Sequence, residues 1–177
     1  KVLITLYKNG SICIEDDAGM GEDGMEKFLL LGSPHKKIES ISPKFKRIRT
    51  GRYGTGRLSF LTSFEKMKLK TRKGNYNKSI IIDESSLNNL FTGNSVLNEI
   101  KEKHLSRNGT ELSLYNAKMS IDPIKLAKEI RKLAILRQPM FQVYIKQTDD
   151  FNEWDFDNVE PVRAQEIQGY RIPISLD

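Results

Sequence analysis

Two glycine-containing turns stand directly before predicted helices, an arrangement that is suited to binding anions. The first turn is residues 16–21 (DDAGMG), and the second is residues 51–56 (GRYGTG). A helix N-terminus presents unpaired N–H groups and a partial positive charge, and glycine lets the backbone approach a phosphate closely. The second turn therefore predicts a phosphate-binding loop, and the alternative is a tight turn that only begins a helix.

The second turn fits neither of the two common nucleotide-binding motifs. A Rossmann fingerprint needs a strand directly before the glycines within a βαβ unit, whereas a basic stretch over residues 33–50 precedes Gly51. A Walker A loop needs Gly-Lys-Ser or Gly-Lys-Thr, and Arg57 follows Gly56 instead. We interpret the basic stretch as a long loop, and long loops in compact domains are often functional lids.

The apolar patterns predict an α/β fold in which most strands are joined as hairpins. Asn9-Gly10 is a strong hairpin signal between the first two strands, and Gly74-Asn75 joins a later pair. We expect the helices to lie on one face of the sheet. The predicted strands are 2–7, 11–15, 67–72, 79–83, 111–115 and 141–146, and the predicted helices are 23–31, 57–64, 96–102 and 122–137.

The predicted helix 122–137 is the most strongly amphipathic segment of the chain. Asp122 is suited to the N-cap and Pro123 to the first helical position. The residues that we expect to face the core are Ile124, Leu126, Ala127, Ile130 and Leu133. In the helix 23–31, the residues expected on the buried side are Met25, Phe28 and Leu29.

The composition excludes several classes of protein but does not identify a ligand. The 177 residues carry a net charge of +6, which permits binding to nucleic acid, anionic lipid or a phosphorylated small molecule. The lone Cys13 excludes an internal disulfide and a cysteine-cluster metal site. No apolar run approaches the roughly 18–20 residues of a membrane span, and no signal-peptide pattern opens the chain, so we expect a cytoplasmic protein with no membrane partner.

The order of these motifs resembles the GHKL ATPases, the superfamily of gyrase, heat-shock chaperones, histidine kinases and MutL. The resemblance covers roughly Val2 to Ile145, and residues 51–59 (GRYGTGRLS) look closest to the chaperone, MutL and MORC branch. It implies a Bergerat-type ATP-binding fold, an α+β sandwich with a mixed, largely antiparallel sheet and helices on one face. It also implies an ATP-binding and ATP-hydrolysing module with a lid, ATP or ADP as ligand, and Mg²⁺ in the complete protein.

By this resemblance, the first turn forms the adenine end of the site. Asp16 falls where the family has the aspartate that accepts the adenine amino group, and Gly19 and Met20 resemble its second glycine and adenine-packing residue. Asp17 is the rival candidate, because it matches the D-x-G-x-G spacing literally. Thr110 matches the family's Gly-Thr, whose hydroxyl supports the aspartate; the alternative is a β-branched residue that starts a strand.

The same resemblance assigns the second turn to the nucleotide phosphates. The residues expected to supply backbone N–H groups are Gly51, Gly54, Thr55 and Gly56. Cations of the 33–50 stretch could screen triphosphate charge, although a basic run is more often only a solvated surface.

The family carries its water-activating glutamate and magnesium-binding asparagine on a helix before the first strand. Because a strand pattern starts at once, at Val2, we expect a fragment that begins after that helix and contains no catalytic or metal-ligating residue of its own. We expect an ATP-binding domain over residues 1–150 and an extension over 151–177 that leads into a following domain. Its partners would be adenine nucleotide, a second copy in an ATP-dependent dimer, and a client protein or DNA.

Two other functions remain open from the sequence. A non-enzymatic nucleic-acid-binding domain would use the net charge and the basic stretch, although few aromatic residues are interleaved with the cations. A histidine-kinase catalytic domain is the other alternative, and the form of residues 51–57 looks unlike the usual kinase box.

Overall fold

The computed structural model describes residues 1–29, 56–86, 98–138, 140–149 and 159–165. These residues form a seven-stranded sheet in the order β5-β4-β3-β6-β2-β1-β7. Among the described strands, neighbours pair antiparallel except β1 and β7, which are parallel. The strands are β1 (Val2–Tyr7), β2 (Ile12–Asp16), β3 (Phe64–Lys73), β4 (Tyr76–Asp83), β5 (Asn98–Glu99), β6 (Gly109–Ala117) and β7 (Val143–Thr148). The predicted mixed, largely antiparallel α/β fold is confirmed.

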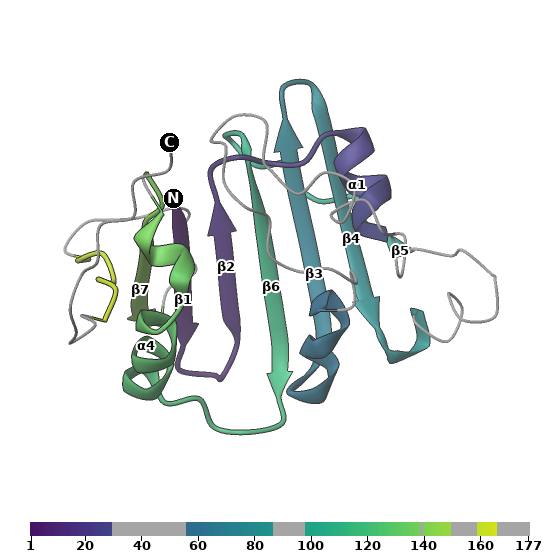
Figure 1. Cartoon of the computed structure of the whole chain (residues 1–177). Coiled ribbons are helices and arrows are strands. Elements are labelled where there is room, and N and C mark those ends of the chain that lie inside the picture. Colours follow the sequence, from purple (N-terminus) through teal and green to yellow (C-terminus); the bar gives the residue numbers. More distant parts are fainter. Residues whose placement is uncertain (30–55, 87–97, 139, 150–158, 166–177) are drawn as a thin grey trace.

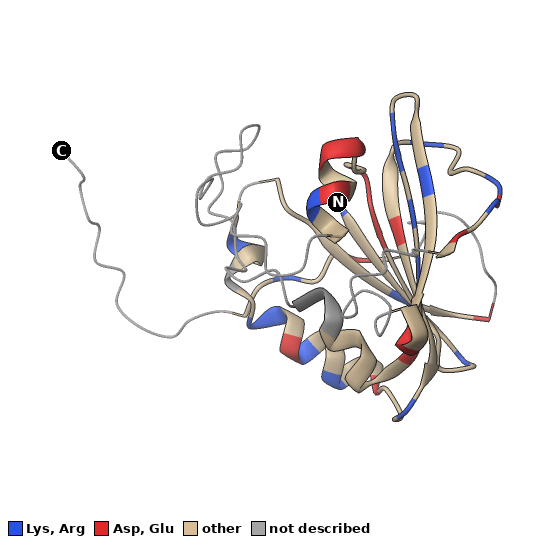
Figure 2. Cartoon of the chain, turned by 90° about the vertical axis from the view of Figure 1, so that its right-hand side faces the viewer, with Lys and Arg blue, Asp and Glu red and all other residues tan. Residues whose placement is uncertain are grey.

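The described helices lie on one face of this sheet, as Figures 1 and 2 show. They are α1 (Glu22–Leu29), the 3-10 helix η1 (Gly56–Thr62), α4 (Pro123–Arg131) and the 3-10 helix η2 (Ala134–Arg137). Met25 of α1 and Phe60 of η1 pack with apolar residues of the sheet, including Met67, Leu69 and Ile80. Burial of this layer drives the packing of helices onto sheet.

The first hairpin forms at the predicted turn. Gly10 has a positive φ of 84°, which glycine adopts without steric cost, and the Asn9 side chain accepts a hydrogen bond from the Ser11 backbone N–H. The register pairs Val2 with Asp16. The turn sets this register, and Asp16 is therefore the last residue of β2.

The opposite face of the sheet, called here the back face, is polar on β3. Strand alternation turns Lys68, Lys70 and Arg72 away from the core. Lys68 and Lys70 both form ion pairs of 3.1 Å with Glu102, and Arg72 donates a hydrogen bond to the Leu105 carbonyl. Residues 100–108, the back-face segment, are thereby held across the cations of β3.

Cys13 also lies on the back face, in the middle of β2. Burial raises the pKa of its thiol to about 12, and the nearby carboxylates of Glu111 and Glu15 act in the same direction. The thiol therefore stays protonated near neutral pH and is no nucleophile.

Two predicted helices differ from the structure. The predicted helix 96–102 is wrong for its described part, because Asn98–Glu99 pair with Ile80 and Ile81 as the edge strand β5. The predicted helix 57–64 is a 3-10 helix over Gly56–Thr62, and Phe64 already belongs to β3, since its backbone pairs with Ala117. Pairing with a neighbouring strand overrides the local pattern in both places.

The prediction for residues 122–137 is right at the start of the helix and wrong at its end. Asp122 caps α4 by accepting hydrogen bonds from the N–H groups of Ile124 and Lys125. The helix ends at Arg131, however, so Leu133 falls outside its periodicity and is 51% exposed. Ile124, predicted inward, is 80% exposed because it lies about 120° around the helix from the buried Ile130.

This geometry predicts a contrast between two isoleucines of α4. Ile130→Ala should lower the free energy of unfolding by about 2–4 kcal/mol, because it empties a buried site. Ile124→Ala should change it by less than about 0.5 kcal/mol, because its side chain is exposed. Urea unfolding of both variants measures the difference, and equal losses would contradict the orientation of α4.

Candidate functional site

A carboxylate and two hydroxyl side chains lie in a row at one end of the sheet. Asp16 on β2 pairs with Thr110 on β6, and Thr110 pairs in turn with Thr71 on β3. Residues in register on adjacent strands project to the same side, here the side that carries the helices. The two threonine hydroxyls are 3.3 Å apart and buried. We call these three residues the polar row.

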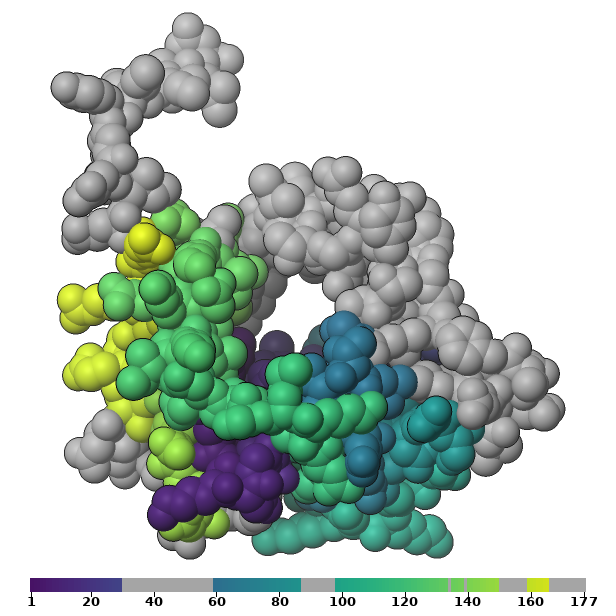
Figure 3. Space-filling view, turned by 90° about the horizontal axis from the view of Figure 1, so that it is seen from below, coloured from purple at the N-terminus to yellow at the C-terminus, as the bar shows by residue number. Residues whose placement is uncertain are grey.

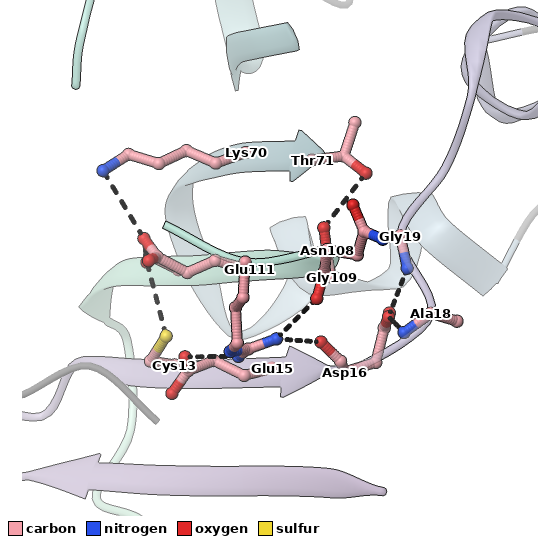
Figure 4. Close-up of polar contacts among 12 residues, drawn as sticks. Cys13, Glu15, Asp16, Ala18, Gly19, Lys70, Thr71, Asn108, Gly109 and Glu111 are labelled. Carbon is pink, nitrogen blue, oxygen red and sulfur yellow. Dashed lines mark hydrogen bonds and ion pairs between the residues drawn. The ribbon is translucent and has the colours of Figure 1, made fainter. Parts of the chain in front are cut away.

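The turn after β2 is built around the Asp16 carboxylate. Its Oδ1 accepts hydrogen bonds from the N–H groups of Ala18 (2.8 Å) and Gly19 (2.9 Å), as Figure 4 shows. The Met20 N–H donates to Thr71 Oγ1 at 2.7 Å. These bonds fix the turn to β3, and a carboxylate has a second oxygen, Oδ2, with which to accept a hydrogen bond from a ligand.

Gly19 is required by the packing of this turn. Its φ is +71°, and a Cβ at this position would lie 2.0 Å from the Arg72 carbonyl oxygen. No side chain fits at that distance unless the turn moves away from β3. The sequence therefore places a glycine where the backbone of the turn meets the end of the sheet.

The two aspartates of the turn have different surroundings. Asp16 is half-buried and belongs to the polar row. Asp17 is exposed, and its carboxylate contacts the backbone nitrogen of Lys1 at 2.8 Å. Met20, predicted to pack on a ligand, is partly buried against the hydrophobic core.

Of the predicted site residues, the structure brings together Asp16, Gly19, Met20 and Thr110. Thr71 was missed by sequence reasoning, although its hydroxyl contacts both the turn and Thr110. One feature of the sequence could have indicated it: Thr71 is a polar residue at the next core-facing position of β3 after Met67 and Leu69. That signal does not reveal its partner, because the register of β6 cannot be read from the sequence.

The predicted phosphate-binding residues Gly51, Gly54 and Thr55 lie outside the described residues, as does the predicted lid over 33–50. Gly56 begins η1, which leads into the start of β3. The polar row lies near the other end of β3, about 23 Å along the strand from Phe64. The structure therefore does not place Gly56 beside Asp16, and the phosphate-binding role stays a prediction.

A hollow opens on the helix side of the sheet. Figure 3 shows it between α4 and η1, with atoms of the N-terminal part of the chain visible behind it. On the same side of the central strands, Ile4, Ile14 and Leu112 are only partly buried. The sheet therefore has accessible apolar surface between its two ends.

Among the described residues, no group of three or more His, Cys, Asp or Glu side chains could hold a metal ion. No residue is therefore assigned to Mg²⁺. No helix within the described ranges has the length and apolar character that a membrane crossing requires.

The chain matches a family described as histidine kinase-, DNA gyrase B-, and HSP90-like ATPase over residues 1–114. This range is more than half of the chain, and it includes the polar row and the turn after β2. The chain belongs to this family. It therefore contains an ATP-binding module of the GHKL superfamily, as the order of motifs indicated. No curated protein matches the chain.

The close packing at Gly19 predicts a measurable difference between two glycines with positive φ. Gly74 has φ +61° and open space around its Cβ position, so Gly74→Ala should cost only about 1–2 kcal/mol of backbone strain. Gly19→Ala should cost at least about 1 kcal/mol more, because the turn must also move away from Arg72. Urea unfolding compares the two variants, and equal costs would refute the close approach.

Proposed function

We propose that this chain binds ATP and ADP, with the adenine base at the polar row. The observation that carries the proposal is the position of the Asp16 carboxylate beside two buried hydroxyls, at the end of a sheet that belongs to an ATPase family. The donor set suits adenine, because a carboxylate oxygen can accept from the exocyclic amino group. Hydroxyls can donate or accept as the ligand requires.

Each residue of the site has a distinct role in this proposal. Asp16 accepts from the adenine amino group through Oδ2, while Oδ1 keeps its bonds to the turn. The side chains of Thr110 and Thr71 form the bottom of the binding site, and Met20 supplies an apolar contact to the adenine ring. Asp16 is favoured over Asp17 because Asp17 lies outside the polar row and faces solvent.

The nucleotide phosphates are proposed to lie at the second glycine-containing turn. Backbone N–H groups of Gly51, Gly54, Thr55 and Gly56 would donate to them, and residues 33–50 would form a basic lid. This part of the proposal is supported by the residue types and their order in the sequence, and by membership of the ATPase family.

The wider setting is also a proposal. We infer that residues 1–150 are the ATP-binding domain and that 151–177 lead into a following domain of a larger chaperone-like, MutL-like or MORC-like cytoplasmic protein. That protein would hydrolyse ATP with Mg²⁺, dimerise when ATP binds, and act on a client protein or DNA. The ATPase family to which the chain belongs supports this setting.

The adenine contact is tested by neutralising each aspartate in turn. Asp16→Asn should weaken binding of a fluorescent ATP analogue by at least roughly tenfold, because the amide presents a mismatched donor and leaves a polar group unpaired at a cost of about 1–3 kcal/mol. Asp17→Asn is the matched control and should bind like the wild type. The reverse result would move the adenine contact to Asp17. Competition by DNA but not by adenosine would favour a nucleic-acid-binding domain.

The phosphate contact is tested at Gly54. Gly54→Val should remove the extra affinity of ATP and ADP over adenosine, because a branched side chain blocks approach of the backbone to a phosphate. Calorimetric titration with adenosine, ADP and ATP isolates the phosphate contribution. If adenosine loses as much affinity as ATP does, the loop has no specific phosphate role.

A further inference from the structure

Arg107 reaches from the end of the back-face segment to the last residue of β2. Its Nη1 donates hydrogen bonds to the carbonyl oxygens of Asp16 (2.8 Å) and Asn108 (3.0 Å). Its Nη2 lies 3.2 Å from the carboxylate of Glu15. Its partners Glu15, Asp16 and Asn108 lie at the end of β2 and before the start of β6, as Figure 4 shows, so the guanidinium contacts the residue that carries the candidate adenine contact.

The ion pair is well shielded on the Glu15 side. The Glu15 side chain is only 5% exposed, and a buried carboxylate is costly unless a cation or hydrogen-bond donors compensate it. Arg107 supplies such a cation with a planar fork of donors, which reaches a carboxylate and a carbonyl at the same time. Glu15 in turn holds the guanidinium in the orientation that places Nη1 at the Asp16 carbonyl.

Space for this contact depends on Gly109. A Cβ at position 109 would lie 2.2 Å from Arg107 Nη1 and 2.3 Å from the Asp16 carbonyl oxygen. Any other residue would therefore separate the two groups. Glycine at position 109, at the start of β6, therefore allows the Arg107 guanidinium to approach β2.

The contact acts on the backbone of the residue that faces the ligand. The last pair of the β2–β6 ladder is Asp16 with Thr110, and Arg107 continues the pairing beyond it with a side-chain donor. Asp16 is therefore held on both sides, by Arg107 at its carbonyl and by the N–H groups of Ala18 and Gly19 at its carboxylate.

We propose that Arg107 is the positioning residue that aims the Asp16 carboxylate, and that it thereby sets the selectivity for adenine over 6-oxopurines. The inference rests on the proposed adenine contact. Hydrogen bonds weaken steeply with poor angles, so a small rotation of Asp16 reduces the gain from an amino group. A 6-oxo group is itself an acceptor and forms no hydrogen bond with the carboxylate, so the orientation of Asp16 does not improve the binding of a 6-oxopurine.

The test is the ratio of affinities for ATP and ITP, measured by calorimetry on the full chain. In Arg107→Lys the charge remains, but a single ammonium group lacks the fork that spans the carbonyl and the carboxylate. The wild type should bind ATP more tightly than ITP. In Arg107→Lys the ratio of the two affinities should fall at least about fivefold, mostly because ATP binds more weakly. Arg137→Lys is the matched control, because Arg137 donates to the Gln165 carbonyl and not to the turn after β2, and this variant should keep the wild-type ratio.

A merely structural role for Arg107 would weaken both nucleotides equally and leave the ratio unchanged, which would overturn the inference. If Arg107→Lys does not fold, the double variant Glu15→Gln/Arg107→Gln removes the buried charge together with its partner and is tested in the same way. A wild type that binds neither nucleotide would refute the proposed function itself.

A second readout needs no nucleotide. Hydrogen exchange of the Ala18 and Gly19 amides should accelerate at least about tenfold in the Arg107 variants, because the turn loses its fixed end. The Ser11 amide, which bonds to Asn9 in the first hairpin, should keep its wild-type rate. Unchanged exchange at Ala18 and Gly19 would contradict the positioning role whether or not nucleotide binds.

Discussion

The turn that follows β2 packs so closely on β3 and β6 that its position is set by backbone contact. At Gly19 the backbone of the turn meets the Arg72 carbonyl, and the Met20 N–H donates to the Thr71 hydroxyl. Thr71 contacts Thr110 in turn. Three strands that are distant in sequence thus meet around a few polar atoms, and the Asp16 carboxylate is held among them. The candidate site depends on this junction, because it joins the turn after Asp16 to β3 and, through Thr71, to β6.

The two faces of the sheet have separate functions in this arrangement. The helix side holds the apolar core and the polar row, so a ligand there would lie on a partly apolar surface. The back face holds Lys68, Lys70 and Arg72 of β3 and the segment 100–108. Arg107 connects the two, since it pairs with Glu15 on the back face and donates to the backbone of Asp16. Changes at the back face can therefore reach Asp16 on the helix side without crossing the core.

Local signals in the sequence were sufficient for much of the fold. Asn9-Gly10 and the alternation of apolar residues located the first hairpin, and Asp122-Pro123 located the start of α4. The helix predicted over 96–102 failed because strand pairing with β4 outweighed local preference. Thr71 and Arg107 were missed for a related reason: their partners lie 51 and 91 residues away, and only the strand register brings them together. Sequence motifs thus singled out Asp16, the residue proposed to contact adenine, and missed Thr71 and Arg107, which hold the turn and the backbone around it.

The central claim is that adenine binds at the polar row, and an NMR titration of the full chain with adenosine tests it most directly. Adenosine carries no phosphate, so its effects report the base and the ribose alone. The largest amide shifts should occur at residues 16–20, at Thr71 and at Thr110, and Asp16→Asn should remove them. Saturable shifts centred on other strands, with those residues unaffected, would contradict it.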